Sequence, residues 1–184
     1  MACDVDCAHQ APLCVEYCSG NGHWVVAAAH QQPTYHWIAV EQQLGRAHKI
    51  IAKKNHMHLS NLEVVCAEAK AWTAHALPAQ SVTRAYIHFP DPWPKRRHHK
   101  HRLMHASFLT ELARVLIAHG EVTLVSDDRT YVEAAIALFA QQNTWIADLP
   151  APHLSALENY GNSTFAQRWQ RLGRAIYLTR WRRL

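Results

Sequence analysis

The sequence lacks the features that would place the protein in or across a membrane. None of its apolar runs approaches the roughly 20 residues that span a bilayer. Its first ten residues include Asp4, Asp6 and His9 and have no apolar centre, unlike a signal peptide. We therefore expect a cytoplasmic protein with no membrane partner.

Recognisable disulfide or zinc frameworks are also missing. The chain has five cysteines, and an odd count without a secretion signal favours free thiols. The first four, Cys3, Cys7, Cys14 and Cys18, are not spaced as the CxxC pairs of structural zinc sites. Histidines cluster at residues 98–105, where the cationic neighbours favour a basic surface over a metal site. We expect no bound metal.

Acidic residues are absent from the two most basic parts of the chain. Eleven of the 19 lysines and arginines fall in Lys95–Arg102 and Arg168–Leu184, and neither stretch contains Asp or Glu. The rest of the chain has eight basic and fourteen acidic residues. Concentrated cations on an acidic body indicate a docking surface for a polyanion. The alternative is that both stretches are ordinary solvent-exposed charged segments that bind no partner.

Length and patterning predict one α/β domain. The 184 residues, 49% of them hydrophobic and 18% charged, suffice for a single folded domain over 1–184, with 1–11 as a short tail. Short β-branched or aromatic runs alternate with helix-like segments, which is typical of a mostly parallel sheet covered by helices on both faces. The predicted strands are Pro12–Cys18, Tyr35–Glu41, Leu62–Cys66, Val82–Phe89 and Glu121–Ser126, with closing strands at Trp145–Leu149 and Arg174–Leu178. The predicted helices are His23–Gln31, Gln43–His56, Glu68–Ala76, Leu103–Ala118 and Arg129–Gln142.

Residues at the carboxyl ends of parallel strands are the first candidates for a ligand site. Gly20 and Gly22 follow the first strand and would let the backbone turn sharply beside a ligand, although a plain strand-to-helix turn would have the same glycines. Glu41 ends the second strand, about 20 residues beyond the glycines, where a carboxylate can accept from ribose hydroxyls. An exposed strand-end Glu is the alternative. Glu68 follows the third strand and could accept from an adenine amino group or favour the dipole of a helix start.

The segment Phe89–Arg102 combines three kinds of residue that structure alone does not explain. Prolines at 90, 92 and 94 restrict the backbone to a rigid loop. They flank Asp91, while Trp93 offers a face on which a base can stack. The cations that follow can contact phosphates without reading sequence.

This segment closely resembles the signature of the bacterial tRNA (guanine-N7)-methyltransferase family, and the resemblance extends from about Val15 to Arg174. It implies a Rossmann-like class I methyltransferase fold, S-adenosylmethionine as methyl donor with S-adenosylhomocysteine as product, and guanosine 46 in the variable loop of tRNA as target. It also implies roles for single residues. Those that would contact the cofactor are Glu16, Glu41, Glu68 and Asp91, with Asp91 also catalytic. Those that would contact the substrate are Lys95, Asp127 and the stretch Ser163–Ala166.

The sequence departs from the family pattern at several positions. Cys18 replaces the first glycine of the loop that follows Glu16 in the family. Glu68 occupies a position where Asp or Asn is typical. Ser163 keeps the hydroxyl of a Thr-x-x-Glu motif, whereas Ala166 lacks its acid. A class I methyltransferase with another substrate and a non-catalytic RNA-binding relative therefore remain alternatives. No obligatory protein partner is indicated, and either a monomer or a homodimer is expected.

Overall fold

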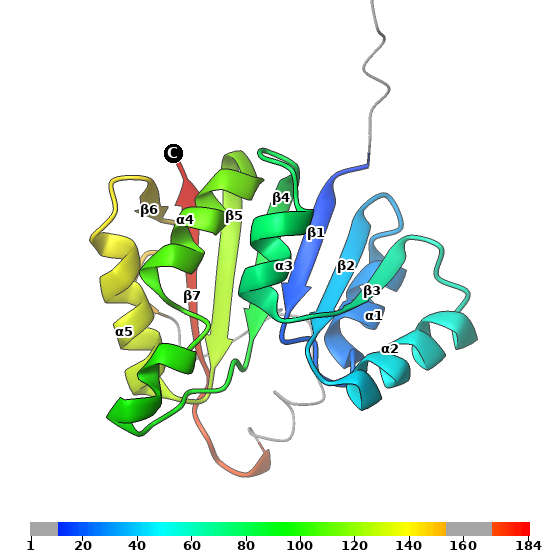
Figure 1. Ribbon diagram of the computed structural model, residues 1–184, viewed down its shortest axis with the longest axis horizontal. Helices are drawn as coiled ribbons and strands as arrows, with labels where there is room; N and C mark the ends of the chain where they lie inside the picture. Colours follow the sequence, from blue (N-terminus) through cyan, green and yellow to red (C-terminus); the bar gives the residue numbers. More distant parts are fainter. Residues whose placement is uncertain (1–10, 154–170) are drawn as a thin grey trace, which may run out of the picture.

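The computed structural model describes residues 11–153 and 171–184, apart from the side chain of Arg96. These residues form a seven-stranded sheet in the order β3-β2-β1-β4-β5-β7-β6 (Figure 1). The strands are β1 Leu13–Tyr17, β2 His36–Glu41, β3 Leu62–Cys66, β4 Val82–His88, β5 Leu116–Ser126, β6 Trp145–Ala147 and β7 Tyr177–Arg183. The α-helices are α1 His23–Gln31, α2 Leu44–His56, α3 Ala69–Ala76, α4 Ala106–Val115 and α5 Arg129–Ala140, and η1 Arg96–His101 is a 3₁₀ helix.

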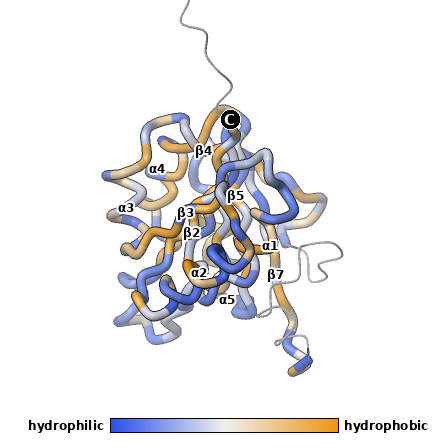
Figure 2. Tube along the Cα trace, turned by 90° about the vertical axis from the view of Figure 1, so that its right-hand side faces the viewer, coloured by the Kyte–Doolittle hydropathy of each residue, from blue (hydrophilic) through white to orange (hydrophobic). Residues whose placement is uncertain are grey.

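Helices cover both faces of the sheet because alternate strand residues point to opposite sides. On β2, Trp37 packs with α1 and α2 in one buried cluster, whereas Ile38 and Val40 belong to a second cluster with α4 and α5. Hydrophobic residues gather along the central strands (Figure 2). The predicted α/β architecture is confirmed. The described residues include no helix that is long and apolar enough to cross a membrane.

The five strands β1 to β5 are parallel, so their carboxyl ends meet at one edge, the lower edge in Figure 1. The chain runs outward from β1 through β2 to β3, then returns to β4 on the other side of β1. This reversal between β1 and β4 is the switch point beside which such sheets bind ligands.

The predicted helix Leu103–Ala118 is wrong at both ends. Residues 103–105 precede α4, and Leu116 begins β5, where it pairs with Val82 of β4. The register then shifts before Arg84 pairs with Glu121, and His119 adopts a φ of 61° in this irregular stretch. A short apolar run such as Leu116–Ala118 fits a helix or a strand equally, so periodicity could not distinguish them.

The closing strand predicted at Arg174–Leu178 is displaced toward the end of the chain. The observed strand β7, Tyr177–Arg183, lies antiparallel between β5 and β6. Its arginines are engaged within the sheet: Arg182 pairs with Asp148, Arg183 donates to the Leu116 carbonyl, and Arg180 donates to Thr123. Arg182 and Arg183 also lie toward the edge opposite the carboxyl ends of the parallel strands, because Glu121 pairs with Arg182 and Ser126 with Tyr177. Much of the second predicted basic segment is thus not a free docking surface.

Candidate functional site

The loop after β1 adopts the left-handed backbone that its glycines predict. Gly20 and Gly22 have φ angles of 57° and 74°. At Gly22, a Cβ would lie 2.7 Å from Cγ1 of Ile50 in α2, so helix and loop approach too closely for a side chain there. Cys18 has a φ of 60°, which explains why the family pattern has glycine at this position. The expectation of a sharp turn at this point is confirmed.

Glu41 anchors this loop from the end of β2. Its Oε2 accepts a 2.8 Å hydrogen bond from the Gly20 amide, and its Oε1 accepts a 2.9 Å bond from the Gln43 amide. The side chain is buried, which excludes the alternative of an exposed strand-end carboxylate. Each carboxylate oxygen can accept a second hydrogen bond, so Glu41 can hold the loop and still accept from a ligand.

Glu16 lies beneath the same loop and is held by a residue of the neighbouring strand. Its Oε1 lies 2.5 Å from Nδ1 of His88, and both side chains are buried. The His88 ring packs on Trp24 of α1, with ring centroids 4.4 Å apart. Oε2 of Glu16 is buried and has no hydrogen-bond partner among the described residues. A buried, orphaned carboxylate oxygen is costly unless a donor from a ligand reaches it.

Glu68 caps the start of α3. Its Oε2 accepts a 2.8 Å hydrogen bond from the Ala71 amide, so this exposed residue lies at the helix start, as the dipole alternative expected, and is its N-cap. The bond occupies one of the two oxygens, and the other carboxylate oxygen remains available for an adenine amino group.

Asp91 is exposed in a loop whose backbone is strained on both sides of it. Phe89 and Trp93 have φ angles of 46° and 42°, a region that side chains other than glycine rarely adopt. Hydrogen bonds to neighbouring segments help to hold the loop in place. Phe89 donates to the Val125 carbonyl at 2.8 Å, and Nε of Arg102 donates to the Pro92 carbonyl at 2.8 Å. Such strain persists only where the surroundings enforce it, and it is typical of functional sites.

Arg102 is in turn positioned by Tyr131 of α5. Its guanidinium lies 5.4 Å from the centroid of the Tyr131 ring. The Tyr131 hydroxyl accepts a 3.1 Å hydrogen bond from the Met104 amide, and burial raises the pKa of this phenol. The loop around Asp91 is therefore connected to the core through Arg102 and Tyr131.

Four carboxylates at the ends of neighbouring parallel strands influence the thiol of Cys18. Burial raises the pKa of the Cys18 thiol to about 12, and the negative charges of nearby carboxylates contribute to this rise. Those carboxylates are Glu41, Glu16, Asp91 and Glu68. A neutral thiol surrounded by acids is no nucleophile. The site instead suits a ligand with positive charge and several hydrogen-bond donors.

Comparisons with known proteins agree with this geometry. Residues 10–179 match the model of a family described as putative methyltransferase. The tRNA (guanine-N(7)-)-methyltransferase of Chlamydia abortus is 40% identical over 169 residues, which cover 91% of this chain and 75% of the relative. The enzyme of the same name from Rubrobacter xylanophilus is 31% identical over 91% of this chain and 75% of its own length. The chain belongs to the tRNA (guanine-N7)-methyltransferase family. A solved SAM-dependent methyltransferase from Aquifex aeolicus shares the fold, with a TM-score of 0.67 and 12% identity over 95% of this chain and 84% of that one.

In this member of the tRNA (guanine-N7)-methyltransferase family, the cations that follow Asp91 lie on a short 3₁₀ helix, where the sequence predicted only a loop. Lys95 is exposed immediately before η1. The Trp93 ring is flanked by His98 and His101, with centroids 5.6 Å and 5.3 Å away. Two of the clustered histidines therefore pack against the tryptophan.

Only some of the predicted substrate residues of this methyltransferase family member lie within the described part of the chain. Asp127 follows β5, and its Oδ2 accepts a 2.9 Å hydrogen bond from Arg174. Asp127 therefore has a cationic partner within its own chain. Ser163 and Ala166 lie outside the described residues.

Three residues of this site were not predicted from the sequence: His88, Arg102 and Tyr131. His88 directly precedes the proline loop, and a histidine near the end of a predicted strand was a usable signal. Tyr131 had no such signal in the sequence, because its hydroxyl accepts a hydrogen bond from the amide of Met104, 27 residues earlier in the chain.

Proposed function

We propose that this protein transfers a methyl group from S-adenosylmethionine to N7 of a guanosine in tRNA, at position 46 of the variable loop. The observation that carries the proposal is that Glu16, Glu41, Glu68 and Asp91 all lie at or just beyond the carboxyl ends of neighbouring parallel strands, beside the switch point of the sheet. It occurs in a chain that belongs to the tRNA (guanine-N7)-methyltransferase family. The substrate implies a cytoplasmic location.

The site residues suit this cofactor chemically. Bound S-adenosylmethionine supplies an electrophilic methyl group on a cationic sulfur, and the acidic surroundings of Cys18 favour a cation. Glu41 would accept from the ribose hydroxyls, as its buried position beside Gly20 supports. Glu68 would accept from the adenine amino group. The orphaned Oε2 of Glu16 would accept from a donor of the amino-acid portion. The turn at Gly20 and Gly22 would allow the backbone to pass close to the cofactor.

Asp91 would act through electrostatics and positioning. Guanine N7 has a lone pair in the neutral base, so no general base is required. Methylation makes the purine cationic, and a fixed carboxylate stabilises the positive charge that develops. Alignment of N7 with the methyl group is a proximity effect, which a strained loop held by Arg102 can supply. Asp127 would help to hold the guanine by exchanging Arg174 for substrate.

Lys95 and the cations of η1 would contact tRNA phosphates beside the site, and Trp93 would offer a stacking face. Basic residues directly after the catalytic loop would bring the polyanion to the cofactor without reading its sequence.

The test is methylation of unmodified tRNA with labelled S-adenosylmethionine, followed by digestion to nucleosides. We expect the label in 7-methylguanosine. Strand scission at 7-methylguanosine by borohydride and aniline should then cut at position 46, and a transcript with adenosine at this position should stay uncut. Label in another nucleoside, or in protein, would support a methyltransferase with a different substrate. Cofactor binding without any transfer would support a non-catalytic relative.

A further inference from the structure

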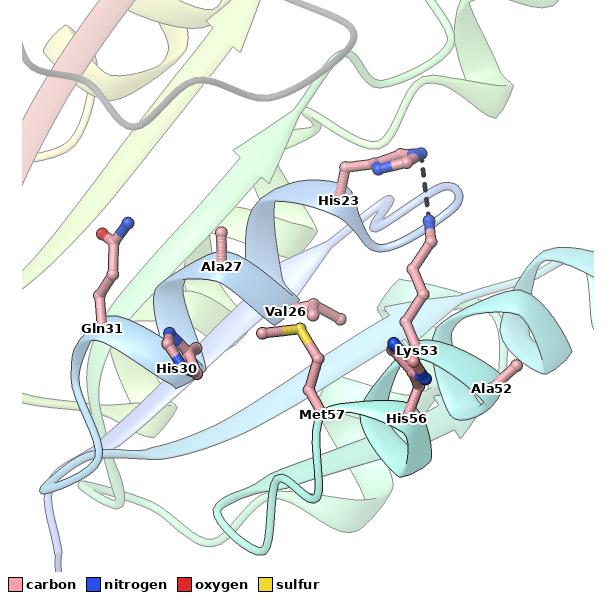
Figure 3. A pocket seen from close by; sticks show the side chains of 9 residues that line it. All are labelled: His23, Val26, Ala27, His30, Gln31, Ala52, Lys53, His56 and Met57. Atoms are coloured by element: carbon pink, nitrogen blue, oxygen red, sulfur yellow. Dashed lines mark hydrogen bonds between the residues drawn. The ribbon is translucent and has the colours of Figure 1, made fainter.

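A groove between α1 and α2 lies outside the catalytic site and has an unusual lining. It has a volume of about 500 Å³ and opens between the two helices (Figure 3). Its cationic and titratable side chains are His23, His30, Lys53 and His56, and none of the described residues that line it is Asp or Glu. Val26 and Met57 are among its apolar residues.

The α2 helix carries a stripe of cations that continues from this groove. Arg46, Lys49, Lys53 and His56 are spaced by three, four and three residues, which places them on one side of the helix. The stripe is about 15 Å long at 1.5 Å per residue. From Gln42 to Leu62 the chain contains no Asp or Glu. Counting charge along the sequence did not reveal this surface, because its residues are spread over positions 46–56 and become neighbours only on a helix.

The cations of this α2 stripe have no acidic partner among the described residues, and they crowd each other. Nζ of Lys53 lies 3.1 Å from Nε2 of His23. Burial and the charge of Lys49 lower the pKa of Lys53, and burial and Lys53 lower the pKa of His23. A bound anion would offset this like-charge repulsion.

The position of the stripe relative to the catalytic site indicates the size of the anion. Lys53 donates to the carbonyl of Asn21, between the two glycines of the cofactor loop. The helix begins at Leu44, three residues beyond the carboxyl end of β2, so Arg46 lies at the same edge as Asp91 and η1. The two cationic surfaces therefore lie at one edge of the sheet. A long polyanion can span both, whereas a small anionic molecule cannot.

From these observations, and resting on the proposed function, we propose that the α2 stripe is a second docking surface for tRNA, where Arg46, Lys49 and Lys53 bind backbone phosphates away from the methylated base. The stripe contacts phosphate and not base edges, so it contributes affinity without selecting sequence. The segment Lys95–Arg102 would hold the tRNA near the target guanosine, and the α2 stripe would hold a separate stretch of the same molecule.

The salt dependence of tRNA binding tests this surface directly. Lys49→Gln removes one exposed cation, and Arg46→Gln/Lys49→Gln removes two. Unlike Lys53, neither side chain has a hydrogen bond or ion pair to the cofactor loop in the part of the chain that the structure describes. The slope of log affinity against log salt should fall by about 0.7–0.9 for each phosphate that a variant no longer binds. Lys70→Gln is the matched control, because it removes the same charge from α3 on the opposite face of the sheet. Its slope should equal that of the unaltered protein.

The outcomes separate this proposal from the proposed function. Binding is measured by filter retention without methyl transfer, and cofactor affinity is measured in parallel by calorimetry. Unchanged slopes for both α2 variants overturn the docking surface, as does an equal decrease in Lys70→Gln. If the unaltered protein binds tRNA without methylating it, the proposed function fails and the slopes still decide the role of α2. If the α2 variants still bind tRNA but no longer bind an acidic protein, the stripe belongs to a protein interface. That result would overturn the proposal.

Discussion

The Gly20 amide donates a 2.8 Å hydrogen bond to Oε2 of Glu41, which joins two residues 21 positions apart in the sequence. The other oxygen of Glu41 accepts from Gln43 at the start of the following helix. One buried carboxylate therefore sets the distance between the glycine loop and the end of β2. The residue proposed to bind the ribose also shapes the loop that surrounds the cofactor.

Glu41→Gln should weaken cofactor binding. The substitution keeps the shape of the side chain but replaces one acceptor oxygen by an NH2 group. This donor would then face another donor, the backbone amide of either Gly20 or Gln43. Loss of a charged hydrogen bond costs about 1.5–3 kcal/mol, so the Kd for S-adenosylmethionine should rise by about tenfold or more. Calorimetry measures this change. Glu63→Gln is the control, because Glu63 is an exposed residue of β3 that pairs with His36. An unaltered Kd in Glu41→Gln would remove Glu41 from the cofactor site.

Asp91→Asn should abolish most methyl transfer and leave the fold intact. Removal of one preorganised electrostatic group costs about 10²–10³ in kcat. The thermal unfolding midpoint should stay constant, because Asp91 is an exposed loop residue outside the hydrophobic core. Turnover of labelled S-adenosylmethionine on tRNA measures kcat. Normal turnover by this variant would show that Asp91 has no part in the reaction.

Gly22→Ala should destabilise the protein, and Gly45→Ala should not. At Gly22 the new methyl group would lie 2.7 Å from Ile50 on a backbone with a φ of 74°. The left-handed backbone alone costs about 1–2 kcal/mol and overpacking adds about 1–3 kcal/mol. Gly45 lies in α2, where a Cβ would have no neighbour within 4 Å, so alanine there should be neutral or stabilising by up to about 1 kcal/mol. Denaturant unfolding measures both, and equal free energies of unfolding would contradict the tight contact at Gly22.

The Cys14 and Cys18 thiols should resist alkylation at pH 8 in the folded protein. Burial is the main cause that raises the pKa of each to about 12, so neither forms the reactive thiolate at this pH. Cys66 is exposed and should be modified before either of them. Mass spectrometry of peptides after iodoacetamide treatment locates the modified residues. Rapid modification of Cys18 without unfolding would contradict the raised pKa of its thiol.

The same two thiols should make stability depend on alkaline pH. Their folded pKa of about 12 lies above the ordinary thiol value of 9.0, so the unfolded chain loses these protons first as the pH rises. The stabilisation is complete below about pH 9 and is lost progressively toward pH 12. Cys14→Ala/Cys18→Ala should flatten this part of the stability profile, and an unchanged profile would exclude both thiols as its cause.

Sequence patterns predicted β1 to β4 to within about one residue at each end because each strand combines a short apolar run with a clear stop. Strand-end placement also selected Glu16, Glu41, Glu68 and Asp91 as candidates for the ligand site. Parallel strands bring their carboxyl ends to one edge, so residues far apart in the chain become neighbours by topology alone.

The errors occurred where local pattern and tertiary pairing disagree. Leu116 belongs to β5 because it pairs with Val82 of β4. Local periodicity does not reveal such a pairing between distant residues. The arginines of β7 were predicted to form part of a free basic segment. In the fold, Arg182 forms an ion pair with Asp148, and Arg183 donates a hydrogen bond to the carbonyl of Leu116. Charge counted along the chain does not distinguish a cation that is paired in the fold from one that is available to a partner.

The contact of α2 with the cofactor loop has a thermodynamic consequence. Ile50 fills the space that a side chain at Gly22 would need, and Lys53, nearly one turn further along, holds the carbonyl of Asn21. An RNA strand that engages Lys53 would compete for the same ammonium group that steadies the loop. The two binding equilibria are then linked, and linkage is reciprocal: the factor by which tRNA changes the cofactor Kd equals the factor by which the cofactor changes the tRNA Kd.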